Sequence, residues 1–281
     1  MSDVPWINVV MAKSTKEEAE LLVLRNELSW LLREEVNPVL QDIRETLQEC
    51  YDCLPFHGTA EKSIRHEELV PQKLILTCPN GTSAMNLKSM VTLRGDCVEG
   101  AELQFKHKLG REHNIFKTKL KDGCVWRLPQ VRDTGNHLCN ALEIVSRNDA
   151  SYVYKSVKEV FLLLDELMES LMKCRQSLSL PKRKSINELM ENQNLLVFNP
   201  ALPSDIAISF YIHTSKLVLA LYCLHQNGQH KLEKVEITHR IQVEAMVKWL
   251  NEAIIFFTLS LQQCQQLKDK LMAVSQILED P

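Results

Sequence analysis

Several features that would point to a familiar class of protein are missing from this sequence. Glycine is scarce, with eight residues in 281, and there is no glycine-rich phosphate loop, GxSxG elbow or HExxH zinc motif. The sequence therefore gives no support to a nucleotide-dependent enzyme, a serine hydrolase or a metalloprotease. The longest nearly apolar run, Ala253–Leu261, is far shorter than the roughly 20 residues that a membrane span requires.

Positive charge is not in excess either. The net charge is −3 and the isoelectric point is about 6.3, so nucleic acid is not expected to be the principal ligand. Val4–Met11 is apolar but too short, and wrongly flanked, for a secretory signal. Nine cysteines are an odd number without a disulfide-like spacing, which is typical of buried thiols in a reducing compartment. These observations together predict a soluble intracellular protein.

What the sequence does contain is long segments with helical spacing. Between Arg240 and Leu278 the apolar residues recur at steps of four and three, which places them on one stripe of a helix. Val153–Leu178 has the same spacing throughout and is expected to follow a cap at Asp149 or Ser151. A shorter helix is predicted from Val131 to about Ser146.

A fourth helix is predicted from Ser14 to about Tyr51. Ser14 and Glu17 have the spacing of a capping box, so residues 1–13 are expected to be irregular. Pro38 lies inside the helix and is expected to kink it, because proline has no N–H and its ring crowds the carbonyl of Glu34. Two helices with a break near Asn37 are the alternative.

Two blocks between the helices have the period of two that is typical of strands. The first begins at Lys73 and is divided by four predicted turns, at Asn80-Gly81, Gly95-Asp96, Leu109-Gly110 and Asp122-Gly123. The second contains two β-branched and aromatic strands followed by a hairpin, at Ile206–His213, Lys216–His225 and Asn227-Gly228. Cys53–Val70 is predicted to be a loop and Asn187–Met190 a single helical turn.

The predicted fold class is therefore α+β, an elongated protein with two domains. An antiparallel four-helix bundle would combine residues 14–53, 130–180 and 240–279, and a separate antiparallel β domain would combine residues 72–128 and 195–239. Both domains are discontinuous in sequence. The zipper-like spacing also permits a coiled coil between two chains, so a leucine-zipper homodimer is the alternative to a monomer.

No constellation of residues predicts catalysis, a metal or a cofactor. Cys50 and Cys53 form a CxxC pair at a helix end, but no second pair accompanies it. Lysines of the first strand block could contact anions, or could protect edge strands from aggregation: Lys106, Lys108, Lys117, Lys119 and Lys121. Lys182-Arg183-Lys184-Ser185 could be a nuclear-import signal or a kinase site, with a solvated loop as the simpler interpretation.

A resemblance to a known family rests on longer stretches. Phe198-Asn199-Pro200-Ala201-Leu202-Pro203-Ser204-Asp205, with the strands that follow it to His225, closely resembles the Rogdi family. Trp249–Ala253 and Leu261–Lys270 are similar to the same family, and further similar pieces extend the match over nearly the whole chain in order. The loop at Gln226–His230 is shorter here than in some relatives.

The resemblance implies a function in protein assembly. It implies a non-enzymatic subunit, related to the small subunit of the yeast RAVE complex, whose partners are rabconnectin-type WD-repeat scaffolds and V1 subunits of the V-ATPase. Such a complex promotes assembly of V1 with Vo and so acidifies vesicles. The resemblance also implies a cytoplasmic protein recruited to vesicle or endolysosomal membranes and synapses, without a membrane span of its own, and a nuclear fraction remains an open prediction.

The segment Phe198–Asp205 is the predicted partner-facing element. Its prolines fix the shape of the backbone, and two of its apolar side chains could anchor a partner. The alternative is that the segment only joins the sheet to the helices. The candidate contact residues are Phe198, Asn199, Pro200, Leu202, Pro203 and Asp205.

Overall fold

The computed structural model describes residues 5–53, 70–78, 86–109, 112–190, 196–227 and 234–279. Helical elements are α1 (Pro5–Trp30), the π-helix η1 (Leu31–Glu35), α2 (Val36–Cys53), α3 (Pro129–Val145), α4 (Val157–Ser179), α5 (Ile186–Met190) and α6 (Lys248–Glu279). Strands are β1 (Gln72–Leu76), β2 (Lys88–Arg94), β3 (Cys97–Leu109), β4 (Glu112–Leu120), β5 (Trp126–Arg127), β6 (Phe198–Asn199), β7 (Ile206–His213), β8 (Lys216–Asn227) and β9 (Lys234–Met246). Helices and antiparallel sheets are thus both major components, which confirms the predicted α+β class.

The chain divides into two compact units. The helical unit contains Met1–Glu49, Asn140–Met172 and Phe257–Pro281. The sheet unit contains Cys50–Cys139 and Lys173–Phe256. The predicted domain boundaries differ from this division and stay a prediction.

The sheet unit contains two antiparallel sheets. Sheet A has the order β1-β2-β3-β4-β6, with β5 paired to β3, and sheet B has the order β7-β8-β9. An isolated bridge between Thr77 and Glu244 links the end of β1 to β9. The predicted turns at Gly95 and Gly123 are present, and both glycines have the positive φ that favours glycine.

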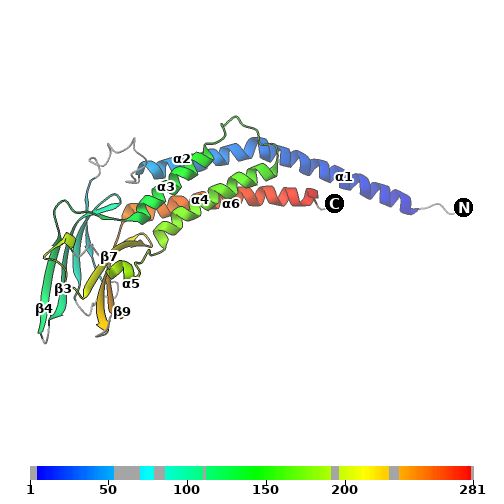
Figure 1. Ribbon diagram of the computed structural model, residues 1–281. Helices are drawn as coiled ribbons and strands as arrows, with labels where there is room; N and C mark the ends of the chain where they lie inside the picture. Colours follow the sequence, from blue (N-terminus) through cyan, green and yellow to red (C-terminus); the bar gives the residue numbers. More distant parts are fainter. Residues whose placement is uncertain are drawn as a thin grey trace. The chain divides into compact units, whose positions relative to one another are not determined.

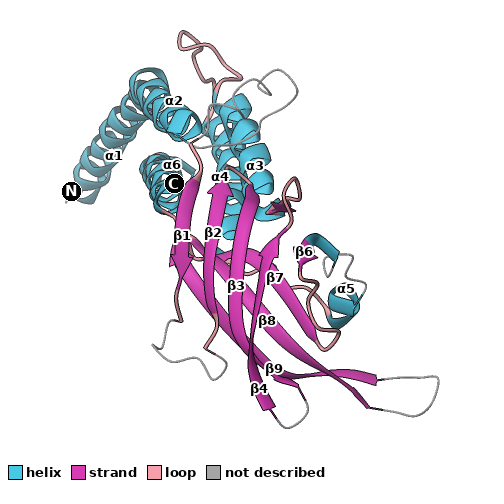
Figure 2. Ribbon diagram, turned by 90° about the vertical axis from the view of Figure 1, so that its left-hand side faces the viewer, coloured by secondary structure: helices cyan, strands magenta, loops and turns pink. Residues whose placement is uncertain are grey.

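The two sheets pack face to face, with sheet A in front of sheet B in Figure 2. Trp126 of β5 meets Phe210 of β7 edge to face, with ring centroids 5.5 Å apart. The other face of sheet B is covered by α5, whose Leu189 joins a cluster of buried side chains that includes Tyr211 and Tyr222. Strand β8 is therefore buried on both faces, as its nearly continuous apolar sequence predicts.

In the helical unit, α2, α4 and α6 lie side by side (Figure 1). Lys268 of α6 pairs with Asp165 of α4, and Lys270 pairs with Glu35 of η1. The predicted stripes of α4 and α6 are buried, which confirms the helical spacing inferred from the sequence: Val160, Leu164, Leu167 and Leu171 in α4, and Phe257, Leu261, Cys264, Leu267 and Leu271 in α6. Within the described residues, no helix has both the length and the apolar character needed to cross a membrane.

Several predicted boundaries were wrong. Residues Arg240–Met246 continue strand β9 and the last helix begins at Lys248, because β8 offers a pairing partner along that whole length. Helix α1 begins at Pro5, so Ser14 lies inside it and does not cap it. Helix α4 begins at Val157 after Ser156, whose hydroxyl accepts a hydrogen bond from the Glu159 N–H.

The helix was predicted to be kinked at Pro38, but the irregularity in the structure is a π-helix that precedes the proline. The π-helix η1 lies just before it, and the Val36 N–H donates to the carbonyl of Leu31 instead of to that of Leu32. The predicted loop Cys53–Val70 and the predicted turns at Asn80-Gly81, Leu109-Gly110 and Asn227-Gly228 lie wholly or largely outside the described residues.

Candidate functional site

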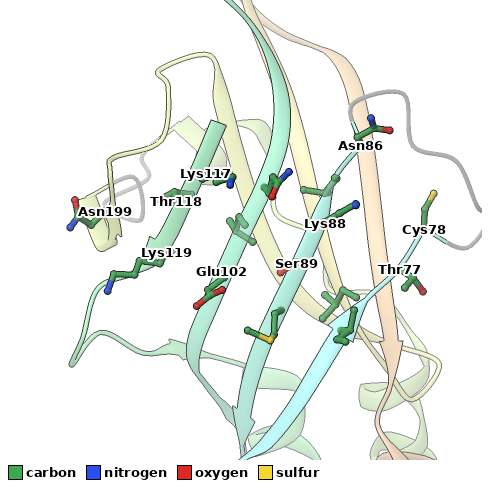
Figure 3. A pocket seen from close by; sticks show the side chains of 16 residues that line it. Thr77, Cys78, Asn86, Lys88, Ser89, Glu102, Lys117, Thr118, Lys119 and Asn199 are labelled. Atoms are coloured by element: carbon green, nitrogen blue, oxygen red, sulfur yellow. The ribbon is translucent and has the colours of Figure 1, made fainter. Parts of the chain in front are cut away.

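A hollow of about 850 Å³ lies on the solvent-facing side of sheet A (Figure 3). Its lining comes from β1, β2, β3, β4 and β6, so it crosses the full width of the sheet. In Figure 3 the labelled Lys88, Glu102, Lys117 and Lys119 come from adjacent strands. All of these residues belong to the sheet unit.

Strand register explains which side chains line the hollow. Successive residues of a strand point to opposite faces, and directly paired residues share a face. One outward row runs Ile75, Met90, Glu102 and Lys119, and the next runs Lys88, Gln104 and Lys117. The residues between these rows, including Leu76, Leu103 and Thr118, are buried and also border the hollow.

This outward side, which we call the lysine face, is strongly basic. Its exposed lysines are Lys73, Lys88, Lys106, Lys117 and Lys119. Five lysines against the carboxylate of Glu102 give these six side chains a net charge of +4, and the half-buried Arg94 beside them is neutralised by its ion pair with Glu99. Apolar side chains accompany them, since Ile75 is 73% exposed, Met90 42% and Ile115 58%. The lysine face thus offers cations and apolar contacts, and five of these residues line the hollow: Ile75, Lys88, Met90, Lys117 and Lys119.

The segment Phe198–Asp205 is built into the sheet unit. Phe198 is 1% exposed and pairs with Leu120 of β4, and the Thr118 hydroxyl donates to the carbonyl of Pro200 at 2.6 Å. Leu202 is buried as well, and the Asp205 carbonyl accepts the N–H of Leu224. The segment therefore connects sheet A to sheet B.

The remaining candidate residues of that segment are less enclosed. Asn199, Pro200 and Asp205 are exposed and Pro203 is half-buried. Asn199 also lines the hollow. Burial of Phe198 and Leu202 leaves neither of them as a surface anchor in this structure, and partner binding by the segment stays a prediction.

The basic run at residues 182–184 is only partly solvated. Lys182 is exposed and pairs with Asp133 at 3.2 Å, but Lys184 is half-buried and lies over the Trp126 ring, 4.7 Å from its centroid. Burial lowers the pKa of Lys184. Ser185 caps α5, because its hydroxyl accepts the Glu188 N–H while its own N–H donates to the Glu188 carboxylate. The simple interpretation of a solvated loop therefore holds for Lys182 but not for Lys184.

The described side chains offer no cluster suited to a metal ion. They contain no group of three or more His, Cys, Asp and Glu residues that could hold a metal ion. Cys50 is buried, and the side chain of Cys53 lies outside the described set. The lysine face can bind a partner through charge and apolar contact.

Sequence reasoning found part of the lysine face and missed the rest. Lys106, Lys117 and Lys119 were named as possible anion contacts, with protection of edge strands as the alternative, whereas Lys73, Lys88 and the apolar residues beside them were not named. The missing signal was the register between strands, which decides that alternate residues of β1 and β2 share a face with those of β3 and β4.

Comparison with known proteins identifies the family. The model of the family described as Rogdi leucine zipper containing protein matches residues 27–234. That span is more than two thirds of the chain. The chain belongs to the Rogdi family.

Relatives in animals match nearly end to end. The zebrafish Protein rogdi homolog is 33% identical over 92% of this chain and 95% of the relative. Protein rogdi of Drosophila melanogaster is 34% identical over 95% of this chain and 93% of its own length. The human Protein rogdi homolog is 31% identical over 95% of this chain and 96% of its own length. The resemblance inferred from Phe198–Asp205 and the C-terminal helix is thereby confirmed for this Rogdi-family chain.

Proposed function

We propose that this Rogdi-family chain is a non-enzymatic adaptor subunit of a RAVE- or rabconnectin-type complex. The complex promotes assembly of the V1 sector onto Vo and thereby the acidification of vesicles. In this proposal the chain's partners are a rabconnectin-type WD-repeat scaffold and V1 subunits, and it reaches vesicle or endolysosomal membranes through them. Its long helices form an antiparallel four-helix bundle that serves as a rigid support.

The observation that carries the proposal is the family match over most of the chain's length. It is supported by the character of the described surface, where a hollow with a net positive charge and exposed apolar residues suits protein docking. An adaptor needs stable surfaces and no reactive groups, so the burial of four thiols fits this role: Cys50, Cys97, Cys174 and Cys264.

The test is co-purification from cell extract. A tagged chain, expressed from its own locus, is expected to recover a rabconnectin-type scaffold and V1 subunits in amounts comparable to the bait. Deletion of the chain is expected to reduce the V1:Vo ratio on isolated membranes and to raise vesicle pH, with rescue by the intact chain. Unchanged V1 recruitment together with no recovered scaffold would contradict the proposal.

A second candidate, a leucine-zipper homodimer, is favoured by one specific observation. The described leucines of the predicted stripe in α1, Leu21, Leu24 and Leu28, are only half-buried, and Leu22 and Val23 beside them are more than half exposed. This stripe could therefore accept a second copy.

A further inference from the structure

The lysine face carries more positive charge than its position in the fold requires. Lysines on edge strands commonly prevent sheets from pairing with each other. Lys119 is paired on both sides, with Glu102 of β3 and Asn199 of β6, so edge protection does not explain it. Lys88 and Lys106 lie on the inner strands β2 and β3. Each of these two lysines is paired on one side only, because the β1–β2 register ends at Ser89 and the β2–β3 register ends at Gln104. The positive charge of this face is also opposite in sign to the net charge of the whole chain, which is −3.

The charge of the lysine face is available to a partner. In the part of the chain that the structure describes, the ion pairs involve other cations: Arg94, Arg147, Lys182, Lys216, Lys268 and Lys270. Glu102 lies directly between Met90 and Lys119 in its row, so it offsets only one of the five lysines. An anionic partner would gain several charge contacts at once, which is the arrangement that produces steered association and specificity.

Apolar residues lie at defined places within this charge. Ile75 and Met90 are directly paired and form the apolar side of the hollow, while Lys117 and Lys119 form its opposite side on β4. Ile115 is paired with Lys106 farther along the same face. A ligand that fits both sides must itself have an apolar side and an acidic side.

We propose that the lysine face docks an acidic, amphipathic segment of a partner protein. The apolar side chains of that segment would cover Ile75 and Met90, and its carboxylates would face Lys88, Lys117 and Lys119. This inference rests on the proposed adaptor role only because it requires a protein partner.

Two properties of the site favour a protein segment over other polyanions. The surface is hollowed, with a volume of about 850 Å³, whereas a bilayer presents a nearly flat surface that would leave the hollow unfilled. Nucleic-acid platforms stack bases on aromatic side chains. The lining residues that the structure describes include no aromatic side chain.

The experiment is a selection of peptides on the intact chain. A random 16-residue peptide library is panned on the immobilised protein, and enriched peptides are measured by fluorescence anisotropy. We expect enriched peptides to contain several Asp or Glu residues with apolar residues on one side. Their affinity is expected to fall at least tenfold on Lys88→Glu/Lys117→Glu/Lys119→Glu.

A matched variant controls for charge alone. Lys155→Glu/Lys158→Glu/Lys248→Glu makes the same change at exposed lysines outside the lysine face and is expected to alter affinity less than twofold. If the first triple variant fails to fold, a salt titration of the unchanged protein replaces it. Affinity is then expected to fall at least tenfold between 0.05 and 0.5 M NaCl, and Ile75→Asp is expected to weaken binding as well.

The outcomes separate this inference from the proposed function. Enriched peptides without acidic residues, or equal binding to both triple variants, would overturn the docking inference even if the scaffold co-purifies. Acidic peptides that bind the lysine face in a chain that recovers no scaffold would leave the inference standing and remove the adaptor proposal. Binding to vesicles of phosphatidylcholine and phosphatidylserine that the lysine reversals abolish, without any peptide binding, would replace the protein segment by a membrane surface.

Discussion

Gln130 shows how one buried side chain can satisfy several backbone groups. Its side-chain carbonyl accepts the Ile212 N–H at 2.7 Å, and its amide donates to the Ile212 carbonyl at 2.8 Å, so it imitates a paired strand at the free edge of β7. The same amide lies 2.9 Å and 2.7 Å from the carbonyls of Ser177 and Leu180. Helix α3, the end of α4 and sheet B are therefore connected through a single residue, which an analysis of periodicity cannot detect.

Gln130→Leu is expected to destabilise the protein strongly. The leucine fills a similar volume but leaves the buried N–H and C=O of Ile212 without partners, and each such group costs about 1–3 kcal/mol. We expect the free energy of unfolding to fall by about 3 kcal/mol or more, measured by urea denaturation.

The matched control is Gln41→Leu. Gln41 is exposed and donates only to Glu45, so its replacement is expected to change stability by less than about 0.5 kcal/mol. Equal effects of the two substitutions would show that Gln130 does not hold these elements together.

At the scale of elements, prediction from the sequence succeeded where local pattern and tertiary packing agree. The stripe of α4 and the strand–turn pattern of sheet A, including the turn at Gly95-Asp96, follow from residue spacing alone. Arg240–Met246 failed because its apolar spacing also fits a helix, and pairing with β8 decides for the strand. The hollow was not predicted for a related reason: the register between two strands cannot be read from the sequence of either strand alone.

The sequence does not decide what packs against the apolar stripe of helix α1. We expect that this stripe does not form a leucine zipper with a second copy of the chain. Leu21, Leu24 and Leu28 span a single heptad, whereas stable coiled coils sustain the pattern over about three to four heptads. The apolar stripes of α4 and α6 are already buried within the chain. Light scattering at micromolar concentration should therefore give the monomer mass of 32.4 kDa.

Leu24→Glu distinguishes the two states of α1. If the protein is a monomer, this substitution leaves the monomeric mass seen by light scattering in place. It also has little effect on the free energy of unfolding, because Leu24 is only half-buried. The opposite outcome is a mass of twice the monomer for the unchanged chain and for the exposed control Glu27→Gln, and a monomer mass for Leu24→Glu. That outcome would contradict the monomer and support the homodimer.

At the scale of the whole molecule, the cysteines report how well the two units exclude solvent. None of the eight cysteines whose side chains are described forms a disulfide in this structure. In the sheet unit, burial together with Asp96 raises the pKa of Cys97 to about 12, and in the helical unit burial raises the pKa of Cys264 to about 12. Alkylation requires the thiolate, so a raised pKa slows it.

We therefore expect Cys97 and Cys264 to resist iodoacetamide at pH 8 in the folded protein. Each pKa unit lowers the thiolate fraction about tenfold, so three units predict labelling roughly a thousandfold slower than for an ordinary thiol, before steric exclusion is counted. Mass spectrometry of tryptic peptides measures each site, with the half-exposed Cys124 as the internal reference and urea-unfolded protein as the control for equal reactivity. Labelling of Cys264 at the rate of Cys124 would mean that the helical unit opens to solvent far more often than its buried stripe allows, and the same result at Cys97 would mean this for the sheet unit.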